Sequence, residues 1–277
     1  MPRIRNILIA PICIIILSLL VAGCGASEDP TQLTLADLEQ ILDDAVTATT
    51  EADSFAVNMA MNLSADMTGS DEGSLYAEMT GDGAFDVANE AMKMDMTMSF
   101  SMDMGFMDIS MEDITVEAYN VDGWQYQHIT IPDVEDEWTK MPTTHDDADM
   151  MDPDYMKDQI DLLKSSAQLE GLRTEEVDGI ECYVIKVTPD AQKIADWISE
   201  QSMMNEQVPA GELQEFEDLM DNVDITVWIA EDSDYLMKFS LDATIDTSEL
   251  ETTSTATEMV ENTILTIGAT ITMSDYN

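Results

Sequence analysis

One stretch of the chain, residues 92–107, alternates apolar and polar side chains with a period of two. It reads MKMDMTMSFSMDMGFM. From Met92 to Met104 every second residue is methionine, except where Phe100 takes that place, and the residues between them are Lys, Asp, Thr or Ser. Because successive side chains of a β-strand point to opposite faces, this pattern predicts a strand with one continuous apolar ridge, about 40 Å long at roughly 3.4 Å per residue.

Similar alternation and turn signals predict further strands. Asp122-Gly123 and Asp178-Gly179 are typical of two-residue hairpin turns, and a change of phase near Gly105 indicates a bulge or a bend. We expect the "GDG" at 81–83 to form a turn before Phe85 and Val87. The other predicted strands cover about 55–67, 75–79, 114–121, 124–131, 172–177, 181–188, 224–230, 235–245 and 254–273.

Helical spacing appears in a few segments. Apolar residues from Leu35 to Val46 recur at three and four positions, and Thr34 is a good N-cap for a helix that ends near Thr50. Further helices are predicted over about 153–168, from Pro189 through Ile198 and over 212–220, while residues 132–153 read as an acidic loop. Strands joined by tight turns favour antiparallel pairing, and a sheet with one apolar face needs a cover. The predicted fold is therefore α+β: a strongly curved antiparallel sheet, or half-barrel, with helices covering its concave face.

The N-terminus predicts export and a lipid anchor. Arg3 and Arg5 precede a nearly unbroken apolar run over residues 7–21, which is short for a spanning helix and typical of a signal peptide. The sequence LVAGC, which ends at Cys24, resembles the lipobox of prokaryotic lipoproteins. This resemblance implies a signal peptide over 1–23, acyl chains on Cys24, a tether over 24–32 and one domain over 33–277. The expected location is the cell envelope, anchored to the extracytoplasmic face of a membrane.

The chain is strongly acidic, with 58 Asp and Glu residues against 10 Lys and Arg and a formal net charge of −48. Such a charge repels nucleic acid, so no nucleic-acid partner is expected. The 45% hydrophobic content argues against a disordered acidic tail. Cys13 is lost with the signal peptide and Cys24 is lipidated, which leaves Cys182 without a partner for an internal disulfide.

Three stretches resemble one known group of proteins. They are LADLEQILDDAVTATTEADSFAVNMAMNLSADM at 35–67, VDGIECYVIKVTPD at 177–190 and DITVWIAEDSDYLMKFSLDATI at 224–245. In their order of helix, long sheet, hairpins and helices they are similar to the lipoprotein-carrier superfamily, which includes LolA, LolB and LppX-like lipoproteins. The resemblance covers nearly the whole mature chain. It implies that a lipid or acyl chain is held between a curved sheet and its helices, and the lipobox favours a tethered binder over a free shuttle.

The methionine ridge is the candidate ligand-binding surface. Methionine is unbranched and polarizable and adapts to varied apolar partners, whereas Val and Ile are the better strand formers. We expect an apolar wall for a lipid or acyl chain formed by Met59, Met61, Met79, Met92, Met94, Met96, Met98, Phe100, Met102 and Met104. The alternative is a structural or interaction lipoprotein whose own helices fill this face and leave no room for a ligand.

Other chemistry has less support in the sequence. Met-x-Met spacing could present thioethers to Cu(I) or Ag(I), but neighbours on one face of a strand lie about 7 Å apart. The Asp-rich segment 145–154 lacks the spacing of a calcium loop. His128 and His145 are the only histidines, and no nucleophile elbow, HExxH, P-loop or dinucleotide turn is present. We therefore expect no enzymatic activity, no cofactor and no metal site. We expect Cys182 to be a small buried residue in a strand.

Overall fold

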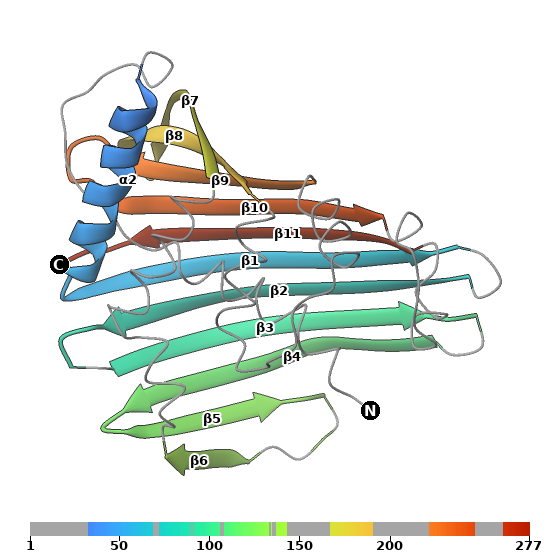
Figure 1. The fold of residues 1–277 in the computed structure, drawn as a ribbon. Coiled ribbons are helices and arrows are strands. Elements are labelled where there is room, and N and C mark those ends of the chain that lie inside the picture. Colours follow the sequence, from blue (N-terminus) through green and yellow to red (C-terminus); the bar gives the residue numbers. More distant parts are fainter. Residues whose placement is uncertain are drawn as a thin grey trace, which may run out of the picture. The chain divides into compact units, whose positions relative to one another are not determined.

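The structure, a computed structural model, describes residues 33–68, 72–89, 91–105, 108–132, 134, 137–142, 167–190, 222–246 and 263–277. Within these ranges the chain forms one helix and eleven strands (Figure 1). The elements are α2 (Leu35–Thr50), β1 (Ser54–Met67), β2 (Gly73–Asp86), β3 (Ala91–Asp103), β4 (Asp108–Val121), β5 (Trp124–Thr130), β6 (Trp138–Pro142), β7 (Ala167–Val177), β8 (Ile180–Pro189), β9 (Val223–Ala230), β10 (Leu236–Asp246) and β11 (Thr263–Ser274).

The strands form one open sheet in the order β6-β5-β4-β3-β2-β1-β11-β10-β9-β8-β7. The β1–β2, β2–β3, β3–β4, β4–β5, β5–β6, β7–β8 and β1–β11 pairs are all antiparallel. The large antiparallel sheet predicted from the alternation is confirmed. The helices predicted from Pro189 onwards and over 212–220, and nearly all of that over 153–168, lie outside the described residues. No helix among the described residues is long and apolar enough to cross a membrane.

Helix α2 begins where the sequence predicts. The Thr34 backbone N–H donates to the Asp37 carboxylate over 2.7 Å, and the Asp37 backbone N–H donates to the Thr34 hydroxyl over 3.3 Å. This reciprocal capping box contributes about 1 kcal/mol to helix stability. The helix lies against β7 and buries Leu38 and Ala45. Leu35, in the first turn of the helix, is 55% exposed although it belongs to the apolar pattern.

Three predicted elements were wrong. Residues 81–83 do not form a turn: β2 runs straight through Gly81 and Gly83, each of which faces a methionine on the neighbouring strand β3. Residues 138–142 form the edge strand β6, although the acidic sequence around them was predicted as a loop. Strand β7 begins at Ala167, where a helix had been expected to reach Gln168. In all three places pairing with a neighbouring strand outweighs the local turn or helix signal.

Both predicted hairpin turns are confirmed. Asp122 and Gly123 have φ of 54° and 73°, and Asp178 and Gly179 have φ of 51° and 86°. These positive values match a two-residue turn between twisted antiparallel strands. The phase change near Gly105 lies at the connection between β3 and β4, where Gly105 has φ of 72°. A second phase change follows within β4, at a register shift beside Asp113, which has φ of 57°.

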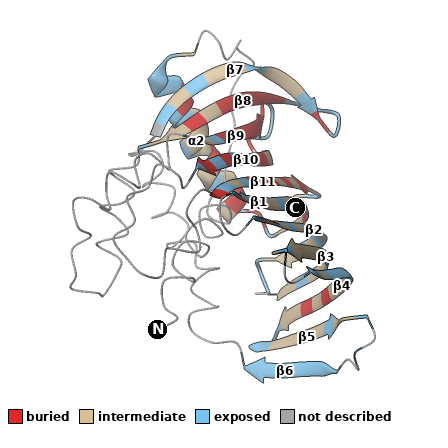
Figure 2. Ribbon diagram, turned by 90° about the vertical axis from the view of Figure 1, so that its right-hand side faces the viewer, coloured by how far each residue is buried: buried red, intermediate tan, exposed pale blue. Residues whose placement is uncertain are grey.

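The chain divides into two compact units, each described by itself here. Unit 1 comprises Met1–Ala52, Thr144–Trp197 and Thr226–Phe239. Part of β8 is buried on both faces, because consecutive residues from Cys182 to Ile185 are all buried. Phe239, with no exposed surface, is the largest fully buried side chain of this core. Figure 2 shows buried positions on β8, β9 and β10.

Unit 2 comprises Asp53–Thr143, Ile198–Ile225 and Ser240–Asn277. Its described strands bury one face: Leu241, Ala243 and Ile245 are inaccessible in β10, while the residues between them are exposed. On β11, Ile267, Ala269, Ile271 and Met273 are buried in the same alternating way. Burial of one face explains the strict two-residue period of the sequence in this part of the chain.

Candidate functional site

The pairing register places the predicted ligand-binding residues on one face of unit 2. Met61 of β1 stands directly opposite Met79 of β2, and Met79 stands opposite Met98 of β3. Residues directly opposite each other in an antiparallel pair point to the same face. The methionine face, as it is called below, therefore contains Met59, Met61, Met79, Met92, Met94, Met96, Met98, Phe100 and Met102, with Met104 immediately after β3.

These side chains are half-buried, including Met104. Some neighbours on the same face are buried: Ile271 of β11 lies opposite Met59, and Val116 of β4 lies opposite Met96. Farther along β4, Met111 lies opposite Phe100 and is exposed. Core residues therefore flank the middle of the methionine face, but not its whole length.

Glycines of β2 make room for the methionines beside them. A Cβ atom on Gly81 would lie 2.8 Å from the carbonyl oxygen of Asp95 and 2.9 Å from Cγ of Met96. A Cβ atom on Gly83 would collide with Sδ of Met94. Both glycines are extended rather than left-handed, so they are required by space and not by backbone conformation. This role of Gly81 and Gly83 was not predicted, although a glycine within an alternating strand is a signal for a close approach of another backbone or ligand.

Polar side chains occupy the opposite face of the same strands. Asp82, Asp95 and Glu117 stand opposite one another on β2, β3 and β4. Lys93 pairs with Asp95, and this carboxylate raises the pKa of the lysine above its ordinary value. The acidic charge of these strands is thus kept away from the methionine face.

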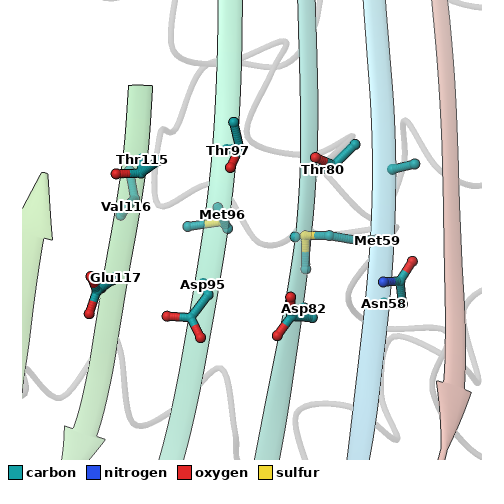
Figure 3. Close-up of a pocket in the computed structure, with 12 residues that line it drawn as sticks. Asn58, Met59, Thr80, Asp82, Asp95, Met96, Thr97, Thr115, Val116 and Glu117 are labelled. Carbon is teal, nitrogen blue, oxygen red and sulfur yellow. The ribbon is translucent and has the colours of Figure 1, made fainter. Parts of the chain in front are cut away.

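A pocket of about 470 Å³ lies on β1–β4 (Figure 3). Its lining includes two of the predicted ligand-binding residues, Met59 and Met96, with Gly81 between them in the register. The other eight positions, Gly81 and Val116 aside, lie in the rows of cross-strand partners on either side of Met59 and Met96, and their side chains point to the polar face. These rows are Asn58, Asp82, Asp95 and Glu117, and Ala60, Thr80, Thr97 and Thr115. The pocket lining is Asn58, Met59, Ala60, Thr80, Gly81, Asp82, Asp95, Met96, Thr97, Thr115, Val116 and Glu117.

An aromatic cluster lies at the β5–β6 edge, on the polar face, and was not predicted. His128 stacks on Trp138 with ring centroids 4.8 Å apart, and Nδ1 of His128 lies 3.8 Å from the Glu117 carboxylate. Nζ of Lys140 lies 4.0 Å from the ring centroid of Trp124. The His128 imidazole thus lies between a ring and a carboxylate, and Lys140 lies over a ring. A short edge strand that carries a lysine and ends in proline is also protected against pairing with another chain.

Cys182 is placed as the sequence predicts, in a strand and fully buried. Burial raises the pKa of its thiol to about 12. Because only the thiolate is a nucleophile, roughly one Cys182 side chain in ten thousand is reactive at pH 8. This thiol is therefore inert packing in the folded protein.

We expect iodoacetamide at pH 8 to alkylate Cys182 at least about a hundredfold more slowly in the native protein than in guanidinium chloride. Both burial and the raised pKa of the thiol disappear on unfolding. Mass spectrometry of the Cys182 peptide after timed quenching measures both rates. Equal rates in the two conditions would contradict the buried placement.

Comparisons with known proteins bear on the fold. A family model described as a family of unknown function, DUF6612, matches residues 37–270. No curated protein matches the chain. Among solved structures, the chain is similar to the lipoprotein LppX of Mycobacterium tuberculosis, with 16% identity, a TM-score of 0.42 and coverage of 88% of this chain and 94% of LppX.

Two further solved structures are similar over comparable lengths. LprF from Mycobacterium bovis has 14% identity and a TM-score of 0.41, with 87% of this chain and 93% of LprF covered. A domain from Vibrio parahaemolyticus, assigned to outer membrane lipoprotein sorting, has 9% identity and a TM-score of 0.20, with 86% and 91% covered.

Proposed function

The chain belongs to the DUF6612 family, and we propose that it is a lipid-anchored protein that binds an apolar ligand, a lipid or an acyl chain, along the methionine face. The observation that carries this proposal is the register of β1–β3. It gathers half-buried methionines from three adjacent strands onto one face and keeps the acidic residues on the other.

The choice of residue supports binding over plain packing. The fully buried strand residues of unit 1 are largely branched or aromatic, such as Val184, Ile185 and Phe239, and these pack in one defined way. The middle of the methionine face instead carries flexible thioether side chains. A surface of this kind can fit acyl chains of different length and shape without a specific polar contact.

The remaining parts of the proposal come from the sequence. Cys24, at the end of LVAGC, carries the acyl anchor, and residues 24–32 tether the domain to the extracytoplasmic face of a membrane. The helical patterns in 153–168, 189–198 and 212–220 supply the cover under which the ligand lies, against a curved half-barrel sheet. The proposed activity is binding, without a catalytic step, and it involves the membrane and the apolar ligand.

A second candidate function is a structural or interaction lipoprotein whose methionine face is filled by its own chain. The burial of Ile271 and Val116 beside the methionines favours this alternative, because both belong to the same apolar face. The two functions differ in what covers the methionine face: a lipid that can be extracted, or side chains of the protein itself.

We expect lipid to copurify with the protein when the mature domain, exported by a cleavable signal peptide without a lipobox and with Cys24 replaced by Ala, is isolated from the soluble extracytoplasmic fraction. Solvent extraction followed by mass spectrometry identifies the lipid, and a fluorescent fatty acid measures uptake by the delipidated protein. About one lipid per chain with saturable uptake is the expected result. No extracted lipid and no uptake would contradict the proposal and favour the structural alternative.

A further inference from the structure

Three methionines lie in one row across three adjacent strands. Met61, Met79 and Met98 are direct cross-strand partners in the β1–β2 and β2–β3 pairs. Directly opposite residues of antiparallel strands have Cβ atoms about 4.5–5.5 Å apart and side chains on one face. The thioether sulfur of methionine lies two flexible bonds beyond Cβ. Three sulfur atoms therefore start from positions that allow them to converge on one ion.

The next row adds two thioethers around a gap. Met59 and Met96 are both partners of Gly81, which has no side chain to separate them. Cγ of Met96 lies 2.9 Å from the position that a Cβ on Gly81 would occupy, while its sulfur and methyl group extend towards β4 (Figure 3). Figure 3 shows the Met59 side chain extending from β1 towards β2. We call the five residues Met59, Met61, Met79, Met96 and Met98 the thioether cluster.

The cluster has the chemistry of a soft-metal site. Thioethers are uncharged, polarizable ligands that select Cu(I) over Zn²⁺, Ca²⁺ or Mg²⁺. In the part of the chain that the structure describes, no group of three or more His, Cys, Asp and Glu side chains is placed to hold a metal. Methionines two residues apart on one strand lie about 7 Å from each other, and this distance argued against a Cu(I) site in the sequence. Cross-strand partners such as Met61 and Met79 lie closer, with Cβ atoms about 4.5–5.5 Å apart.

We propose that the thioether cluster binds a soft monovalent cation, Cu(I) or Ag(I), with Met61, Met79 and Met98 as ligands and with Met59 and Met96 as further donors from the adjacent row. The half-buried state of all five side chains leaves them accessible to a small ion. The net charge of −48 draws cations to the protein, while the neutral cluster gives selectivity for soft ones. This activity is independent of the apolar ligand and uses the same face.

The test is a Cu(I) affinity measurement under anaerobic conditions, by competition with a chromophoric Cu(I) chelator, and an isothermal titration with Ag(I). The intact mature chain is expected to bind one ion tightly. The triple variant Met61→Leu/Met79→Leu/Met98→Leu is expected to lose at least about a hundredfold in affinity. The matched control Met92→Leu/Met102→Leu, on β3 but outside both rows, is expected to change affinity by less than about threefold.

Two further measurements separate the cluster from other donors. Affinity is expected to be the same at pH 5 and pH 7, because thioethers do not titrate, whereas thiol and imidazole ligands must lose a proton. Cys182→Ala is expected to leave the affinity unchanged. Loss of binding at pH 5 or in the Cys182→Ala variant would place the ion on other residues and overturn the proposal. The proposal would also be overturned if the wild-type protein bound no ion, or if the triple variant and the control had equal affinities.

Fatty-acid uptake and metal binding by the wild-type protein, measured side by side, distinguish the two proposed ligands. Absence of metal binding together with normal fatty-acid uptake would overturn only the metal site. Metal binding without fatty-acid uptake would overturn only the proposed apolar ligand.

Discussion

The double variant Met96→Asp/Met98→Asp is expected to lose fatty-acid uptake by at least about a hundredfold. Both residues lie on β3 in the middle of the methionine face, opposite Gly81 and Met79. A carboxylate that remains ionised against an apolar ligand costs several kcal/mol in lost hydration, and each 1.4 kcal/mol is a factor of about ten in affinity. Titration of the delipidated protein with a fluorescent fatty acid measures the loss.

The matched control is Thr97→Asp. Thr97 lies between the two substituted methionines on the same strand, is exposed and points to the opposite face. It adds one carboxylate, against two in the double variant, at nearly the same place on β3 but on the opposite face. A loss of uptake confined to the double variant would therefore point to the methionine face. Circular dichroism and thermal unfolding of all variants exclude unfolding as the cause. Unchanged uptake by a folded double variant would show that the ligand does not contact this face.

The second large effect is expected from Gly81→Val, which should lower the free energy of unfolding by about 1–3 kcal/mol, the usual range for overpacking. The new Cβ would lie 2.8 Å from the carbonyl oxygen of Asp95, so the β3 backbone would have to move. Valine is otherwise the better strand former, and propensity alone would predict the opposite sign. Urea denaturation followed by tryptophan fluorescence gives the change.

Ala84→Val provides the control for this glycine. Ala84 lies on the same strand, is exposed and points away from the methionine face. Its substitution should change the free energy of unfolding by no more than about 0.5 kcal/mol. A similar loss in both variants would mean that β2 rejects valine in general, and stability equal to wild type in Gly81→Val would contradict the close approach of β3.

Much of the fold could be predicted because its signals are local. The hairpin dipeptides Asp122-Gly123 and Asp178-Gly179 fix turns through the backbone conformations that they favour. The capping box at Thr34 and Asp37 starts α2 at the expected place. Alternation over residues 92–104 predicted both β3 and the face to which its methionines point.

The errors occurred where local and non-local signals disagree. Gly81 and Gly83 form a turn-like sequence, yet they lie inside β2 because β3 brings methionines close to that backbone. Strand β6 lies in an acidic, proline-bounded segment, yet it pairs with β5. A short stretch of sequence does not contain the strand with which it pairs. Local propensity and spacing therefore could not predict that Gly81 and Gly83 lie within β2, or that residues 138–142 form β6.

The sequence by itself determined which residues share a face within each strand, because side-chain direction alternates along an extended backbone whatever its neighbours are. Only the tertiary structure decided which strands are neighbours and in what register. That choice placed Met61, Met79 and Met98 in one row and put Gly81 between Met59 and Met96. The physical reason is that a one-residue shift in pairing would turn a strand over, and the register is fixed by burial of one face across many strands together.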